Sequence, residues 1–152
     1  MSGHMLNNFL GVWIMGAAVY IAASNPQLRE LIFVDGKMIA RHLETLSTLA
    51  EDNGLRRLEM YLSQSAEETK AFFVDQLGVA PEEIDMNKIQ ENWYSPEEGS
   101  RYFTSLRQVV EQDKFYFKEA EKYRVLDDIN SFIDVISTLR DADVRWHLAV
   151  DF

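Results

Sequence analysis

The chain contains no cysteine among its 152 residues. This absence excludes a disulfide framework, a thiolate nucleophile and a cysteine-based zinc site. It suits a reducing compartment, so we expect a cytoplasmic protein. Glycine is also scarce, with seven residues, and neither a phosphate-cradling glycine loop nor a Gly-x-Ser-x-Gly nucleophile turn is present.

Clusters of basic residues are lacking as well. Lysine and arginine number 15 against 25 aspartates and glutamates, which gives a formal net charge of −10. Binding a phosphate backbone requires clustered cations, and an anionic membrane surface repels a negative chain. The sequence therefore predicts no nucleic-acid partner and argues against a membrane partner.

No apolar run has the length of a membrane span. The apolar part of the uncharged N-terminal stretch covers 9–23, or 15 residues, whereas a spanning helix needs about 20. A helix, a strand and a membrane-associated segment remain alternatives for 9–23. We favour a helical or irregular lead followed by a strand over 17–23. Residues 1–5 resemble a cloning remnant, which leaves the translation start open between Met5 and Met15, and we expect 6–152 to form a single domain.

What the chain does contain is clearest in its last 35 residues. Apolar residues recur there at steps of three and four, which predicts an amphipathic helix over 118–140. The period then changes to two. Strict alternation predicts a strand over 144–152, with one buried face and one polar face. The polar face carries Arg145, His147 and Asp151.

Helix boundaries are marked elsewhere by capping residues. Ser95 followed by Pro96 and two glutamates is typical of a helix start. Gly99 in the first turn indicates that another backbone or a ring, for example Trp93, packs closely there. Similar signals predict further helices, and glycines 54 and 78 mark two of the ends. The predicted helices cover 37–52, 66–77, 96–112 and 118–140.

Together these patterns predict a mostly helical α+β fold. Four main helices would pack on a small sheet that pairs the N-terminal strand 17–23 with the C-terminal strand 144–152. An uncovered apolar strand at the end of the chain would promote aggregation. Either a neighbouring strand or a second copy of the chain should therefore cover it, so a homodimer remains open.

His147 is the strongest candidate for catalysis, as a general base assisted by a carboxylate. Residues four apart on a strand lie about 13 Å from each other, so His147 and Asp151 cannot form a dyad alone. A carboxylate from another element would be needed. The alternative is a structural histidine, hydrogen-bonded to a neighbouring strand or helix. No His-Glu-x-x-His and no EF-hand loop is present, so we predict no metal site and no cofactor.

The acidic charge is concentrated in the middle of the chain. Residues 61–100 carry nine acidic and two basic residues, and a basic protein is their natural complement. Exposed aromatic residues often anchor interfaces, which makes Trp93 and Tyr94 candidates; Trp93 packed at the start of its helix is the alternative. The predicted binding residues are Trp93, Tyr94, Glu82, Glu83, Asp85 and Glu97.

The leading hypothesis is accordingly a non-enzymatic, acidic interaction protein of the bacterial kind. It would act as an inhibitor or immunity-type protein that binds a basic partner. The second hypothesis is a small hydrolase-like enzyme that uses His147, with Arg145 and Asp151 on the same face. A third is an acidic mimic of a nucleic-acid backbone.

Overall fold

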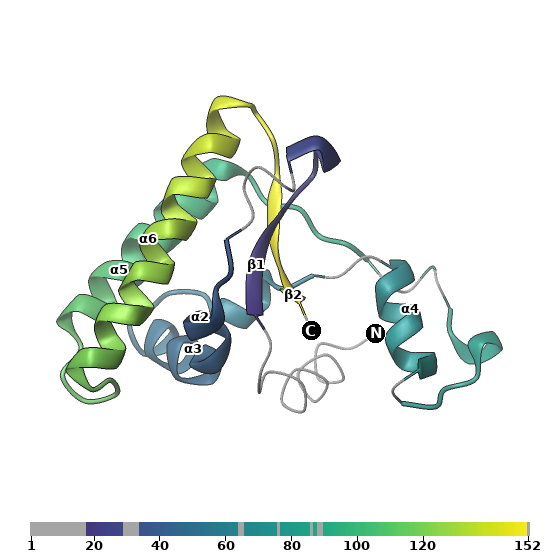
Figure 1. The fold of residues 1–152 in the computed structure, drawn as a ribbon, viewed down its shortest axis with the longest axis horizontal. Helices are drawn as coiled ribbons and strands as arrows, with labels where there is room; N and C mark the ends of the chain where they lie inside the picture. The colour runs from purple at the N-terminus through teal and green to yellow at the C-terminus, as the bar shows by residue number, and fades with distance from the viewer. Residues whose placement is uncertain are drawn as a thin grey trace.

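The computed structural model describes residues 18–28, 34–63, 66–75, 77–85, 87 and 90–151. The predictions for residues 1–17 lie outside them. A two-stranded antiparallel sheet joins the two ends of this part of the chain (Figure 1). It consists of β1 (Ala18–Ala23) and β2 (Trp146–Asp151), with Ala18 opposite Asp151 and Ala23 opposite Trp146. The predicted pairing of the N-terminal and C-terminal strands is confirmed.

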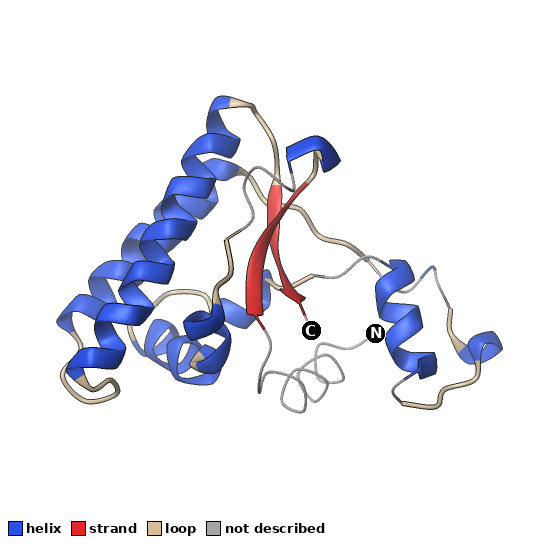
Figure 2. Cartoon of the chain, viewed as in Figure 1, coloured by secondary structure: helices blue, strands red, loops and turns tan. Residues whose placement is uncertain are grey.

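The described residues are mostly helical, as Figure 2 shows. The two longest helices, α5 and α6, pack side by side on one side of the sheet, while α4 lies on the other side (Figure 1). The predicted α+β fold with four main helices is therefore confirmed. The four main helices are α3 (Leu43–Asp52), α4 (Ala66–Asp75), α5 (Pro96–Gln112) and α6 (Glu119–Asp141), and the shorter α2 (Lys37–Arg41) precedes α3. The 3-10 turns are η1 (Pro26–Leu28), η2 (Leu58–Tyr61) and η3 (Pro81–Glu83).

One face of the sheet forms part of the main hydrophobic core. Every second residue of each strand points into it, as the pleat requires. Apolar residues from α3, α5 and α6 fill the space opposite, and the periodicity of α6 delivers Ile129, Phe132 and Ile136 to it, all fully buried. The strand residues in the core are Val19, Ile21, Ala23, Trp146, Leu148 and Val150.

The other face of β2 differs from the prediction. The expected polar face is buried at His147 and Ala149, each 2% exposed, and is open at Arg145 and Asp151. Alternation in the sequence identified the core face correctly, but it could not show that another segment covers part of the opposite face. The segment in contact with His147 includes Trp93.

Helix α5 begins as its sequence predicts. The Ser95 hydroxyl oxygen accepts a hydrogen bond from the Glu98 amide at 3.2 Å, with Pro96 in the first turn. The ring that packs on Gly99 is Trp146, not Trp93. A Cβ atom at Gly99 would lie 2.7 Å from the indole nitrogen, and that nitrogen donates to the Ser95 carbonyl at 2.8 Å. Gly99 thus lets the C-terminal strand contact the helix directly.

The predicted helix 37–52 is divided at His42, whose backbone leaves the helical region with φ −110° and ψ 22°. The His42 ring packs edge-on against Phe117 at 5.3 Å. The start of α2 has no cap of its own. Asp128 of α6 supplies one, because its carboxylate accepts the amides of Met38 and Ile39 at 2.9 and 3.2 Å. Burial raises the pKa of Asp128, while these two hydrogen bonds partly oppose the rise.

Helix α4 ends near Gly78, which has a positive φ of 68°, as expected for a helix stop. The predicted helix 66–77 is too long by two residues, because α4 ends at Asp75. Phe73 of α4 is buried, whereas Leu77, beyond its end, is 52% exposed.

Candidate functional site

The most acidic part of the described chain is a protrusion at residues 66–85, which we call the acidic arm. It comprises α4, η3 and the connection between them, and lies well away from the α5–α6 pair (Figure 1). It contains six acidic residues and one lysine. The side chains of Glu82, Glu83 and Asp85, three of the predicted binding residues, are exposed, and the apolar Leu77 is exposed as well.

The two ends of the arm are fixed side by side on the free edge of β2. Before the arm, the Ser63 amide donates to the Leu148 carbonyl at 2.9 Å. After the arm, Tyr94 and Trp146 exchange two backbone hydrogen bonds of 2.8 and 3.0 Å. A further bond, from the Asn92 amide to the Ser63 hydroxyl oxygen at 3.0 Å, ties the two ends together. We call 62–63 and 91–94 the roots of the arm.

Backbone bonds from the roots thus cover the apolar terminal strand on the edge that β1 leaves free. The opposite edge of the sheet is also occupied, since Gly36 exchanges hydrogen bonds with Val19. The neighbouring strand predicted to cover the terminal strand is β1, while the homodimer stays a prediction.

His147 lies between the two roots. Its Nε2 atom is 2.8 Å from a carboxylate oxygen of Glu91, and its Nδ1 atom is 2.8 Å from the Leu148 carbonyl oxygen. The Trp93 ring covers it at a centroid distance of 4.4 Å. The side chain of His147 is 2% exposed and that of Glu91 is 29% exposed. The structure therefore joins a buried histidine to a carboxylate from another segment.

The catalytic role of His147 stays a prediction, and the structure contains one feature that this role requires. A second element does supply a carboxylate, namely Glu91, which the sequence did not single out. Asp151 and Arg145 are exposed and do not form the pair with His147. Nothing in the sequence could have identified Glu91, because it lies in an irregular segment 56 residues away from its partner.

The aromatic candidates are less exposed than the sequence suggested. Trp93 and Tyr94 are both half-buried. Tyr94 packs against Tyr61 and Trp146, at 4.8 and 5.7 Å between ring centroids, and its hydroxyl donates to the Met60 carbonyl at 3.2 Å. Both rings help to fix the arm to the sheet. Among the predicted binding residues, Glu97 is exposed, in the first turn of α5.

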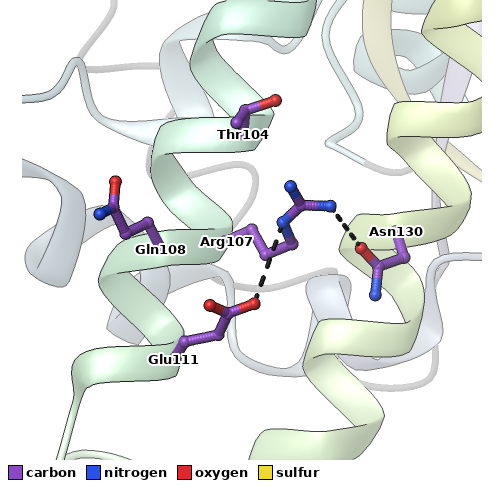
Figure 3. A pocket seen from close by; sticks show the side chains of 5 residues that line it. All are labelled: Thr104, Arg107, Gln108, Glu111 and Asn130. Carbon is purple, nitrogen blue, oxygen red and sulfur yellow. Dashed lines mark hydrogen bonds and ion pairs between the residues drawn. The ribbon is translucent and has the colours of Figure 1, made fainter.

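A shallow polar pocket of about 380 Å³ opens between α5 and α6 (Figure 3). Arg107 lies across it, donating to the Asn130 side-chain oxygen at 3.0 Å and approaching Glu111 at 3.9 Å. Thr104 and Gln108 complete the lining. Because its one cation is already paired, the pocket lacks an unsatisfied charge that would select a ligand.

The loop between α5 and α6 presents an exposed aromatic ring that the sequence did not single out. Phe115 is 94% exposed and Tyr116 is 48% exposed. The loop is held by buried Asp113, whose carboxylate accepts the amides of Phe115, Tyr116 and Phe117 at 3.0–3.2 Å. The loop is therefore an ordered turn with an unprotected apolar tip.

Within the described residues, no three histidine or acidic side chains are grouped closely enough to hold a metal ion. None of the helices in this part of the chain combines the length and apolar character needed to cross a bilayer. Comparison of the chain with family models, characterised proteins and solved structures gave no significant match.

Proposed function

We propose that the protein acts by binding a basic protein through its acidic arm. The observation that carries this proposal is the position of the arm: six acidic residues and one lysine on a protrusion, away from the packed helices. An inhibitor or immunity-type protein, of the bacterial kind and working in a reducing cytoplasm, is the form of this function that we favour.

Three physical features support the proposal. Like charges gathered on one protrusion produce a local field that attracts a basic surface and accelerates association. Exposed Leu77 supplies an apolar contact among these charges, and interfaces combine apolar contacts with a polar rim. The anchored roots also reduce the ordering that binding would otherwise require.

Affinity purification with an arm variant tests this proposal. In Glu82→Gln/Glu83→Gln/Asp85→Asn, three exposed charges are removed without loss of side-chain volume. We expect the wild-type protein to retain a basic partner whose binding weakens as salt rises, since screening acts strongly on exposed charges. The triple variant should lose this partner.

A matched control separates the arm from the net charge. Asp127→Asn/Asp134→Asn/Asp141→Asn removes the same number of exposed charges from α6 and should keep the partner. Equal loss in both triple variants, or a partner whose binding ignores salt, would contradict the proposal.

The second candidate function is a small hydrolase that uses His147 as general base. The specific observation in its favour is the Glu91 carboxylate at 2.8 Å from the ring, since a carboxylate can orient a catalytic histidine. The burial of His147 argues against this function, because both of its ring nitrogens already face oxygen atoms of the protein. Hydrolysis of p-nitrophenyl acetate by the wild type, lost in a folded Glu91→Gln variant, would favour this function, whereas equal background rates would reject it.

The remaining partner predictions can be measured on the same material. Sedimentation velocity over a range of concentrations tests the homodimer. Competition between the protein and duplex DNA for the retained partner tests mimicry of a nucleic-acid backbone, which requires carboxylates at phosphate-like spacing.

A further inference from the structure

The His147 ring contacts both roots of the acidic arm. Its Nε2 atom meets Glu91, at the beginning of the second root. Its Nδ1 atom meets the carbonyl oxygen of Leu148, and this same oxygen accepts the Ser63 amide of the first root. One buried ring therefore links the strand to the two segments that fix the arm.

The hydrogen-bonding capacity of these groups requires an additional proton. A carbonyl oxygen and a carboxylate oxygen can only accept, and a neutral imidazole has a single N–H group. With neutral His147 and ionised Glu91, one of the two 2.8 Å contacts would bring two lone pairs together. A proton on the ring removes this conflict, since both nitrogens of the imidazolium donate. The Trp93 ring, at 4.4 Å, also favours a cation.

Loss of this proton weakens one root or the other. If the neutral ring donates to Leu148, its Nε2 lone pair faces Glu91 and repels the second root. If it donates to Glu91, its Nδ1 lone pair faces the carbonyl that holds Ser63. Whichever tautomer forms, a contact at hydrogen-bond distance becomes repulsive.

We propose that His147 is a proton-dependent clip that fixes the acidic arm to the sheet. The arm is held firmly while the ring carries its additional proton and more loosely once that proton is lost. The inference rests on the proposed function in one respect, since the clip regulates the surface that we assign to the basic partner.

The groups around the His147 ring indicate that the His147–Glu91 pair is what responds to the proton. Among the described contacts, Glu91 is the charged group that meets His147. On its own strand, Arg145 and Asp151 are exposed to solvent. Across the sheet, the residue opposite His147 is Ala22, which carries no charge.

Hydrogen exchange measured by NMR tests the clip without any partner. The amides of Ser63 and Tyr94 report on the two roots, and buried amides of α5 and α6 serve as internal references for the intrinsic effect of pH. We expect protection of at least one root to fall about tenfold relative to the references between pH 5.5 and 8.5, as for the loss of one buried hydrogen bond. The ring nitrogens of His147 should both carry protons at the lower pH.

The decisive variant is Glu91→Gln. Its amide can donate to Nε2 of a neutral His147, whose Nδ1–H donates to Leu148, so no additional proton is needed. The variant should keep both roots protected and lose the pH response. Glu97→Gln makes the same change at an exposed position of α5 and should respond like the wild type.

A pH response that persists in Glu91→Gln would overturn the proposal. The same holds if hydrogen-exchange protection of both roots in the wild type does not change with protonation of the ring, or if the ring carries a single proton at pH 5.5. None of these results depends on the basic partner. Failure of the clip is therefore distinguishable from failure of the proposed function, which the triple variants of the arm report.

Discussion

Replacing Gly99 with alanine tests the closest contact between α5 and the C-terminal strand. The new Cβ atom would lie 2.7–2.9 Å from three atoms of the Trp146 indole, whereas ordinary contacts begin at 3.4 Å. The ring cannot move away easily. It is fully buried, stacks on Tyr61 at 5.2 Å and is hydrogen-bonded to the Ser95 carbonyl.

Two effects of opposite sign decide the outcome. Alanine is better than glycine inside a helix by about 1 kcal/mol. Overpacking a rigid core costs about 1–3 kcal/mol. Because the clash involves a ring held on several sides, we expect Gly99→Ala to lower the free energy of unfolding by about 1–2 kcal/mol. For a chain of this size that corresponds to a fall in melting temperature of about 2–8 °C.

The assay is a double-mutant cycle with Trp146→Phe, followed by urea denaturation and far-ultraviolet circular dichroism. The smaller phenylalanine ring removes the indole nitrogen and leaves room for the methyl group. In that background Gly99→Ala should be neutral or stabilising by up to about 1 kcal/mol. Thr104→Ala, at an exposed position of α5, measures the gain from helix propensity alone.

The reasoning fails if Gly99→Ala stabilises the wild-type protein as much as helix propensity alone would. It fails equally if the substitution has the same effect in both backgrounds, because the coupling energy would then be zero. In either case the close approach of Trp146 would not be the reason for the glycine.

Three further predictions concern stability. Phe115→Ala should change the free energy of unfolding by less than about 0.5 kcal/mol, since the ring is 94% exposed. Phe117→Ala, at a buried ring of the same loop, should lower it by about 3–5 kcal/mol. Similar losses for the two variants in denaturant melts would contradict this prediction and show that Phe115 also supports the fold. Burial raises the pKa of Asp128, so the folded state keeps this proton to higher pH than the unfolded state and loses stability as pH rises through the folded pKa. Asp128→Asn keeps an acceptor for the two amides of α2 and does not titrate, so its free energy of unfolding should rise relative to that of the wild type as pH rises above about 4, the ordinary pKa of an aspartate. A difference that stays constant with pH in urea titrations would contradict this. Gly36→Ala would press its methyl group against the backbone carbonyl of Val19, and thermal melts should show a loss of about 1–3 kcal/mol; an unchanged melting temperature would refute the close approach.

Local patterns in the sequence determined most of the fold. The spacing of apolar residues defined α6 and β2 because burial of one face imposes a period of 3.6 or 2 on the chain. Ser95 defined the start of α5, since a cap acts within one turn. The charge of the acidic arm could also be read directly, because neighbours along the chain stay neighbours on an irregular protrusion.

Only the tertiary structure decided which distant residues meet. It placed Glu91 beside His147, Trp146 instead of Trp93 on Gly99, and Asp128 at the start of α2. Each contact joins residues 45 or more positions apart, and periodicity carries no information over such separations. The alternation along β2 could show that His147 points away from the main core. It could not show that the roots of the arm would bury this residue on the opposite face of the strand.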